Sequence, residues 1–262
     1  MKVAIAIGVS LIVVAVPAGA RELKVCADPN NLPFSNDREQ GFENKIARIV
    51  ANELGAELRY VWFAQRRGNV RETLNAGLCD LIPGVGSSLE MLATTRPYYR
   101  STYVTVVKDP ALKGLASFDD KRLEQLRIGV QLIGDDGSNA PPAHSLSRRG
   151  LIENIRGYTI YGDYQDPAPQ RPIIDAVARD DVDIAFVWGP TAGYFARLQS
   201  VPLALAPVTP QVDGPTLPMV YEVSMGLRRQ DVSLKREVEG ALAKRSVEIR
   251  KLLSDYGVPL VD

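Results

Sequence analysis

The apolar positions in the first half of the chain fall into short stretches that alternate between strand and helix patterns. Residues 23–27 alternate apolar with polar or small side chains, which is typical of a short strand. Residues 42–54 carry apolar side chains at helical spacing, and a glycine follows them. Strand-forming runs at 57–63 and 78–85 flank a short expected helix that begins at Asn69. This order predicts parallel strands joined by right-handed crossovers.

The second half repeats this pattern after a β-branched strand at 103–107 and a break at Pro110 and Gly114. Residues 201–218 are rich in proline and are expected to form an extended connector. The expected strands of this half are residues 127–131, 158–161, 182–187 and 221–227. The expected helices are residues 117–125, 145–151, a segment that begins at Ile173, residues 191–198 and one long amphipathic helix from Ser233.

Together these elements predict an α/β protein with two lobes. Each lobe would contain a mixed, mostly parallel sheet, and two hinge crossings would join the sheets. We expect residues 21–108 and 219–262 to form one lobe and residues 109–218 to form the other.

The first twenty residues have a different character and are expected to be a signal peptide. Lys2 precedes an apolar run at 3–16, and small residues at 18–20 match an A-x-A cleavage pattern. The run is short for a membrane span, although an uncleaved N-terminal anchor is the alternative. We therefore expect an exported protein that begins at Arg21 and has no membrane span after cleavage.

Two cysteines, Cys26 and Cys79, fall in expected strands. If these strands are neighbours, the two side chains lie within bridging distance, and export permits a disulfide. We expect the bridge; the alternative is two buried free thiols.

Charge and motifs exclude several kinds of function. The chain has 31 basic and 31 acidic residues, and loss of Lys2 with the signal peptide leaves 30 against 31. That balance does not favour nucleic acid or anionic lipid as a partner. No nucleophile elbow, P-loop or dinucleotide-binding glycine motif is present, and the single histidine leaves few general bases. The sequence therefore predicts neither an enzyme nor a bound cofactor.

Candidate binding residues follow the expected strands, where open α/β sheets usually bind ligands. Asn31 and Phe34 lie in the loop after the first strand, Arg66 follows the second strand of the first half, and Trp188 ends the strand at 182–187. For each of them a core or solvent-exposed role is the alternative.

Asp135 follows the strand at 127–131 and is a further candidate. With Asp136 and the sole histidine, His144, it suggests a metal or acid–base site. The spacing of an EF-hand loop is absent, so a solvated acidic turn is the favoured interpretation and no metal site is expected.

Two α/β lobes after a signal peptide, joined near Val106 and again near Met219, resemble a periplasmic solute-binding protein. The segment VDIAFVWGPTAGYFA resembles the strand and helix of the second lobe that face the binding cleft in that family. Three further motifs match: Leu32-Pro33-Phe34, Gly84-Val85-Gly86-Ser87 and Pro97-Tyr98. The resemblance adds Ser87 and Tyr98 to the cleft candidates and implies a periplasmic location.

A more specific resemblance is to the MxaJ/XoxJ group of periplasmic proteins associated with quinoprotein methanol dehydrogenases. The segments that carry it are IGVQLIGDDGSNAPPAHSLSRRG, RGYTIYGDY and VDIAFVWGPTAGYFA. The resemblance implies that a PQQ-dependent methanol dehydrogenase is the protein partner, bound during its maturation or activation. Any metal would belong to that partner.

One departure from the wider family bears on the ligand. Amino-acid-binding members carry an arginine soon after the G-x-x-S/T motif, which clamps a carboxylate. Here residues 87–92 contain Glu90 but no arginine, and the next arginine is Arg96. This argues against ordinary amino-acid import. Two other functions stay open: a substrate-binding protein that delivers an unknown small solute to an ABC transporter, and an enzyme on the same fold, such as a dehydratase.

Overall fold

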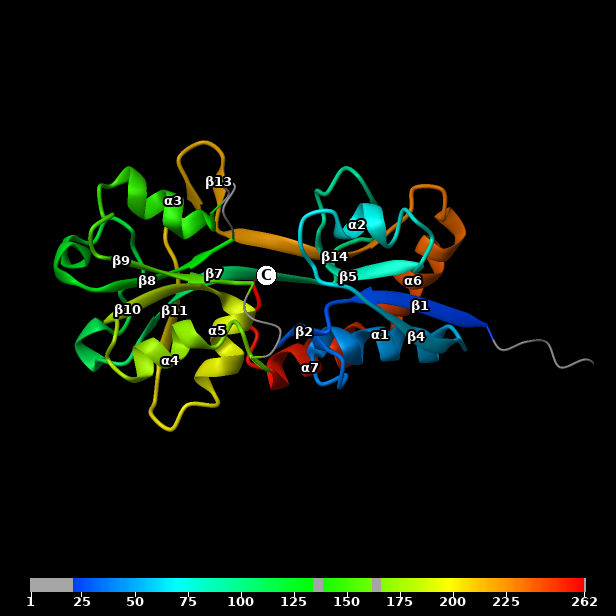
Figure 1. The fold of residues 1–262 in the computed structure, drawn as a ribbon, viewed down its shortest axis with the longest axis horizontal. Coiled ribbons are helices and arrows are strands. Elements are labelled where there is room, and N and C mark those ends of the chain that lie inside the picture. Colours follow the sequence, from blue (N-terminus) through cyan, green and yellow to red (C-terminus); the bar gives the residue numbers. More distant parts are fainter. Residues whose placement is uncertain (1–20, 134–138, 162–165, 262) are drawn as a thin grey trace, which may run out of the picture.

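The computed structural model describes residues 21–133, 139–161 and 166–261, and its main feature is one long mixed sheet (Figure 1). The strands of this sheet are β1 (Glu22–Ala27), β4 (Glu57–Trp62), β5 (Leu81–Gly86), β6 (Ala93–Thr94), β7 (Tyr99–Val107), β8 (Ile128–Leu132), β9 (Ile155–Thr159), β10 (Ile184–Trp188), β11 (Ala204–Pro207) and β14 (Val220–Leu227). Their order is β4-β1-β5-β14-β7-β10-β8-β9, with β11 paired to β7 and β6 paired to β14. Two small hairpins complete the strands: β2 (Asn30–Asn31) with β3 (Ser35–Asn36), and β12 (Val212–Asp213) with β13 (Leu217–Pro218).

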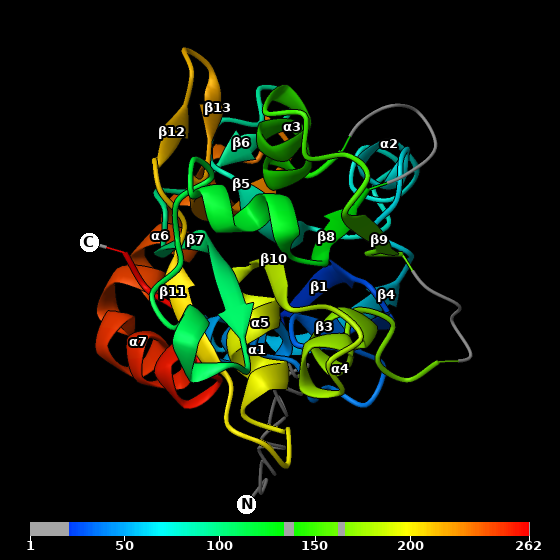
Figure 2. The ribbon, with the colours of Figure 1, turned by 90° about the vertical axis from the view of Figure 1, so that its left-hand side faces the viewer.

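The helices cover the sheet in two groups, one on each half of the molecule (Figures 1 and 2). The first group is α1 (Phe42–Glu53), α2 (Asn69–Glu72), α6 (Val232–Lys244) and α7 (Ser246–Asp255). The second is α3 (Pro141–Arg148), α4 (Pro172–Ala178), α5 (Gly189–Ala196) and the 3₁₀ segments Pro110–Leu112 and Lys121–Gln125.

The parallel pairings follow the predicted crossovers. Strand β1 pairs in parallel with β4 and β5, and β8 pairs in parallel with β9 and β10. The fold is therefore the predicted α/β architecture with a mixed sheet in each half: the pairs of β1 and β8 are parallel, and those of β7 and β14 are antiparallel.

Strand β7 joins the two halves of the sheet. Its first residues, 99–102, pair with β14, and residues 103–107 pair with β10. Strand β14 begins directly after Met219 and crosses in the opposite direction. The two expected sheets are therefore continuous through β7, while the proposed lobe boundaries stay a prediction.

Separate hydrophobic cores lie in the two halves. The first is centred on α1, with Phe42, Ile46 and Val50 fully buried between β1, α6 and α7. In the second half, one cluster contains Phe118 and Phe186 and another contains Ile173 and Phe195. Helix α1 forms because its apolar residues recur on one face, which packs onto the sheet.

Several expected elements differ from those observed. Of the helix expected at 117–125, only Lys121–Gln125 is helical, as a 3₁₀ segment capped by Asp120, while Ser117 bridges to Thr209. The strand expected at 158–161 is β9, which begins three residues earlier, at Ile155, where its pairing with β8 begins. The proline-rich stretch 201–218 contains β11, which pairs along β7, and the β12–β13 hairpin. The single C-terminal helix is two helices, because the backbone leaves the helical conformation at Arg245.

The predicted disulfide is confirmed: Cys26 on β1 is bonded to Cys79, just before β5. Both sulfur-bearing residues are buried beside Leu74, Ile82 and Leu92. Among the described residues, the helices are all too short or too polar to span a bilayer.

Candidate functional site

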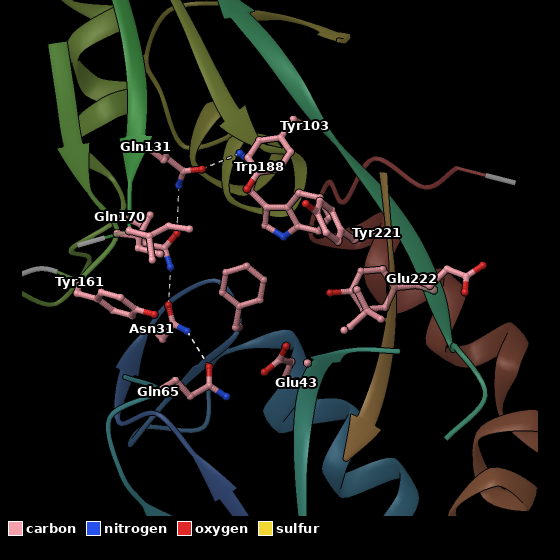
Figure 3. A pocket seen from close by; sticks show the side chains of 17 residues that line it. Asn31, Glu43, Gln65, Tyr103, Gln131, Tyr161, Gln170, Trp188, Tyr221 and Glu222 are labelled. Carbon is pink, nitrogen blue, oxygen red and sulfur yellow. Dashed lines mark hydrogen bonds between the residues drawn. The ribbon is translucent and has the colours of Figure 1, made fainter. Parts of the chain in front are cut away.

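A cavity of about 510 Å³ lies where the two halves of the sheet meet (Figure 3). It opens at the carboxyl ends of β1, β4, β5, β8 and β10, which is where open α/β sheets usually bind ligands. Its volume is within the range of sites for small molecules, roughly 300–1,000 Å³. The lining residues are Asn31, Phe34, Glu43, Gln65, Gly84, Gly86, Tyr99, Tyr103, Gln131, Ile133, Ile160, Tyr161, Gln170, Trp188, Tyr221, Glu222 and Val223.

Three aromatic rings form one wall of the cavity. The ring centroids of Tyr103 and Trp188 are 5.2 Å apart, and those of Trp188 and Tyr221 are 5.8 Å apart. The register of the sheet produces this cluster, because Trp188 on β10 pairs directly with Tyr103 on β7. Burial raises the pKa of Tyr103 and of Tyr221, so both phenols stay neutral at physiological pH. The wall is therefore uncharged and polarisable, and its rings are inclined to one another, by 60° between Tyr103 and Trp188 and by 79° between Trp188 and Tyr221.

A chain of side-chain amides crosses the other side of the cavity and links the two halves (Figure 3). Asn31 donates to the Gln65 carbonyl at 3.3 Å and accepts from the amide of Gln170. Gln170 in turn accepts from Gln131 at 3.4 Å and from the Thr191 hydroxyl at 2.9 Å. Because Asn31 and Gln170 come from different halves, their hydrogen bond holds the two sides of the cavity together.

Gln170 is the centre of this chain, so its removal is expected to destabilise the protein. The Gln170→Ala variant should lose about 1–3 kcal/mol of unfolding free energy, because the buried groups of Gln131 and Thr191 and the partly buried amide of Asn31 lose their partner. Urea denaturation measures this loss. The matched control is Gln230→Ala at an exposed position, which should change the free energy by less than about 0.5 kcal/mol. Equal losses in the two variants would contradict the role of the amide chain.

Glu43 is the carboxyl group that faces the cavity from α1. The residue is 2% exposed and sits in the first turn of the helix. Burial, together with the nearby charge of Asp28, raises its pKa from 4.5 to about 8. The cavity lining therefore includes a carboxyl group that is mostly protonated at neutral pH.

Of the residues predicted for the cleft, Asn31, Phe34 and Trp188 line this cavity. Arg66 lies at its edge, with the guanidinium carbon 5.8 Å from the ring centroid of the lining residue Tyr161. The binding roles of these four residues stay predictions.

The other predicted residues lie elsewhere. Ser87 is outside the lining and donates to the main-chain and side-chain oxygens of Glu222 at 3.3 Å. Tyr98 lines a separate, smaller cavity against α6 and α7. The neighbouring residue, Tyr99, lines the main cavity instead. Asp135 lies outside the described residues.

The sequence reasoning missed Glu43 and the glutamines. Gln131 was detectable, because it is a polar residue at the end of the apolar run 127–131. Glu43 gave no signal, since a charged residue in the first turn of an amphipathic helix is normally solvent-exposed. Gln65 and Gln170 lie in loops, where polar residues are common.

The ionisable side chains of the cavity lining are acidic or phenolic, and none is basic. Its members include the carboxyl groups of Glu43 and Glu222, and the described lining residues include no lysine, arginine or histidine. An anionic ligand would therefore meet no basic side chain in the lining itself, although Arg66 lies at the edge of the cavity. Within the described ranges, no group of three or more His, Cys, Asp or Glu side chains is placed to hold a metal ion. The arrangement is suited to binding through aromatic contacts and amide hydrogen bonds.

Comparison with known proteins identifies relatives along nearly the whole chain. No family model matches the sequence. The chain is 31% identical over 268 residues to Protein MoxJ of Paracoccus denitrificans, covering 97% of this chain and 95% of that protein. The crystal structure of the periplasmic binding protein XoxJ from Methylobacterium extorquens AM1 is 38% identical, covers 92% of this chain and 99% of its own, and superposes with a TM-score of 0.74. The crystal structure of MxaJ from Methlophaga aminisulfidivorans MPT is 27% identical to this chain and superposes with a TM-score of 0.79. The match covers 91% of this chain and 100% of the MxaJ chain. The chain therefore belongs to the MoxJ family and has the fold of a periplasmic binding protein.

Proposed function

We propose that this protein is a periplasmic, non-catalytic accessory protein of methanol oxidation that binds a PQQ-dependent methanol dehydrogenase during its maturation or activation. The observation that carries the proposal is the relationship to MoxJ over 97% of the chain. The resemblance of its segments to the MxaJ/XoxJ group, noted from the sequence, names the dehydrogenase as partner.

The cavity supports a binding role of this kind. Aromatic side chains such as Trp188 and Tyr221 contribute strongly to protein interfaces, because they bury large apolar areas. The lining offers no basic group for a free amino-acid carboxylate, in contrast to the arginine clamp of amino-acid receptors. A segment of the dehydrogenase would enter between the two halves, and bending of β7 and β14 near residues 102 and 219 would open and close them.

Binding to purified dehydrogenase tests the proposal. The protein is immobilised, and its affinity for the apo and holo forms of the dehydrogenase is measured by biolayer interferometry. The Trp188→Ala variant is expected to bind at least about 30-fold more weakly, as for an aromatic residue central to an interface. The control is Val247→Ala on α7, where the side chain is 83% exposed and distant from the cavity lining. Absence of binding to both forms, or unchanged binding by the Trp188 variant, would overturn the proposal.

A second candidate function is delivery of a small solute to an ABC transporter. The cavity volume of about 510 Å³ favours it, since this is the size of a small-molecule site. A single solute present at 100 times its Kd would then stabilise the protein by about 2.7 kcal/mol. A thermal-shift screen of small metabolites, run beside the dehydrogenase assay, separates the two functions.

A further inference from the structure

Glu43 occupies an unusual position for a carboxyl group. Figure 3 shows its side chain pointing from α1 toward the space below Trp188 and Tyr221. Glu43 is only 2% exposed. Within the described ranges, no hydrogen bond or ion pair joins its carboxyl group to another residue. A buried carboxyl group without a partner is costly in free energy, so its presence in a cavity points to a group that arrives from outside.

The backbone beneath the carboxyl group is shaped to leave room for it. Gly84, within β5, has a φ of +70°, and a Cβ at this residue would lie 2.0 Å from the Glu43 Oε1 atom. Only glycine fits both the conformation and the space. The carboxyl group is therefore held against the main chain of β5, with its free side toward the cavity.

The surroundings of Glu43 attract positive charge. Phe34, Tyr99, Trp188 and Tyr221 line the same cavity, and aromatic faces attract cations. The other lining acid, Glu222, is exposed and lies 3.6 Å from Arg100, so its charge is already partly balanced. Glu43 is therefore the buried acid that is available to a ligand.

We propose that the cavity binds a cationic group, an ammonium or a guanidinium on an apolar body, with the Glu43 carboxylate as its counter-ion and the aromatic rings as its walls. This inference rests on the proposed binding function and defines the chemistry of what the cavity takes. The cation belongs either to a lysine or arginine side chain of the partner protein or to a free organic amine; both present the same chemistry.

Binding of a cation at Glu43 has a measurable consequence. The titratable groups whose charges act on or respond to Glu43 are Asp28, Tyr60, Tyr98 and Tyr99, and none of them is cationic. In the absence of a cationic ligand Glu43 is mostly protonated at pH 7, because its pKa is about 8. A cation stabilises the carboxylate, so the proton leaves to solvent as the ligand binds.

Isothermal titration calorimetry with a matched set of probes tests the proposal. The small probes are 2-phenylethylamine, the neutral 2-phenylethanol and the anionic phenylacetate. The peptide probes are Ac-Ala-Lys-Ala-NH₂ and Ac-Ala-Arg-Ala-NH₂, with Ac-Ala-norleucine-Ala-NH₂ as the neutral control. We expect binding by cationic probes only, with release of about one proton at pH 7, measured in two buffers of different ionisation enthalpy, and almost none at pH 9, where Glu43 is already ionised and the amines are still mostly protonated.

The variant Glu43→Gln keeps the shape of the protonated side chain and is expected to bind the cationic probe at least about 30-fold more weakly, with no proton release. The control is Glu53→Gln on the same helix, where the carboxylate pairs with Lys244 and Arg245 far from the cavity lining. Preference for a lysine or arginine peptide assigns the cation to the partner, and preference for the free amine assigns it to a metabolite; either supports the proposal. Equal binding of neutral and cationic probes, or no binding of any cationic probe, overturns it. If the cation proposal is overturned in this way but the Glu43→Gln variant still binds the dehydrogenase, the proposed function is retained.

Discussion

Breaking the disulfide between Cys26 and Cys79 is expected to lower the free energy of unfolding by about 4 kcal/mol. The two cysteines are 53 residues apart in sequence, and the bond restricts the unfolded chain across the whole segment that contains α1, β4 and α2. A loop of this length places the loss near the upper part of the usual range for a single bridge. Few other single changes in the chain should cost as much.

Urea denaturation of the oxidised and the reduced protein measures this effect. The variant with both Cys26→Ala and Cys79→Ala should unfold at the same urea concentration as the reduced parent, apart from a small packing loss, because both cysteines are buried. Addition of reductant to the double variant is the control and should change nothing. A difference of less than about 1 kcal/mol between the oxidised and reduced protein would contradict the prediction.

The second large effect is a dependence of stability on pH that comes from Glu43. Its pKa rises on folding from 4.5 to about 8, so the folded protein binds this proton more tightly than the unfolded chain. Glu43 therefore makes stability fall as pH rises between about 5 and 8, by up to about 1.4 kcal/mol per pH unit. Replacement by glutamine removes the ionisable group and with it this slope.

We expect Glu43→Gln and the parent protein to have similar unfolding free energies at pH 5, and the variant to be more stable at pH 9 by several kcal/mol, on the order of 4. Unfolding in urea at pH 5, 7 and 9 measures both proteins. In the control Glu53→Gln the stability difference from the parent has the opposite sign, because hydrogen bonds from Lys244 and Arg245 lower the pKa of Glu53. That variant should be the less stable one at pH 7 and should approach the parent as pH falls through 4. Parallel pH profiles for the parent and Glu43→Gln would contradict a buried, protonated carboxyl group.

The local elements of this fold follow closely from local sequence. Alternation at 23–27 and helical spacing at 42–54 predicted β1 and α1, because each pattern matches the period of one regular structure. The disulfide was predictable because cysteines in or just before two strands of one parallel unit become neighbours: Cys26 lies on β1 and Cys79 just before β5, which pairs with β1. The C-terminal break at Arg245 was not predictable, since apolar spacing continues across it and only the packing of α7 on the core of the first half requires it.

Tyr98 and Tyr99 illustrate which part of the site the sequence could not predict. Both follow Pro97, and the motif resemblance selected Tyr98. Tyr98 lies just before β7 and Tyr99 is its first residue; their ring centroids are 5.1 Å apart, yet Tyr99 lines the main cavity and Tyr98 lines the smaller one. The pairing of Tyr99 with Val223 on β14 sets that choice, and it comes from a segment more than a hundred residues away.

The sequence by itself determined the order of strands and helices and the strand-end positions of Asn31, Phe34 and Trp188, because these depend on neighbours along the chain; it also indicated the disulfide, because the chain has only two cysteines, both close to expected strands. The tertiary structure alone decided that Glu43 faces a cavity and that Gln131 and Gln170 meet Asn31 across it. Crossover connections and the long strand β7 bring those residues together from separate parts of the chain. The charge and the hydrogen-bonding groups of the site are properties of that assembly, since no local pattern encodes which polar side chains lose contact with water.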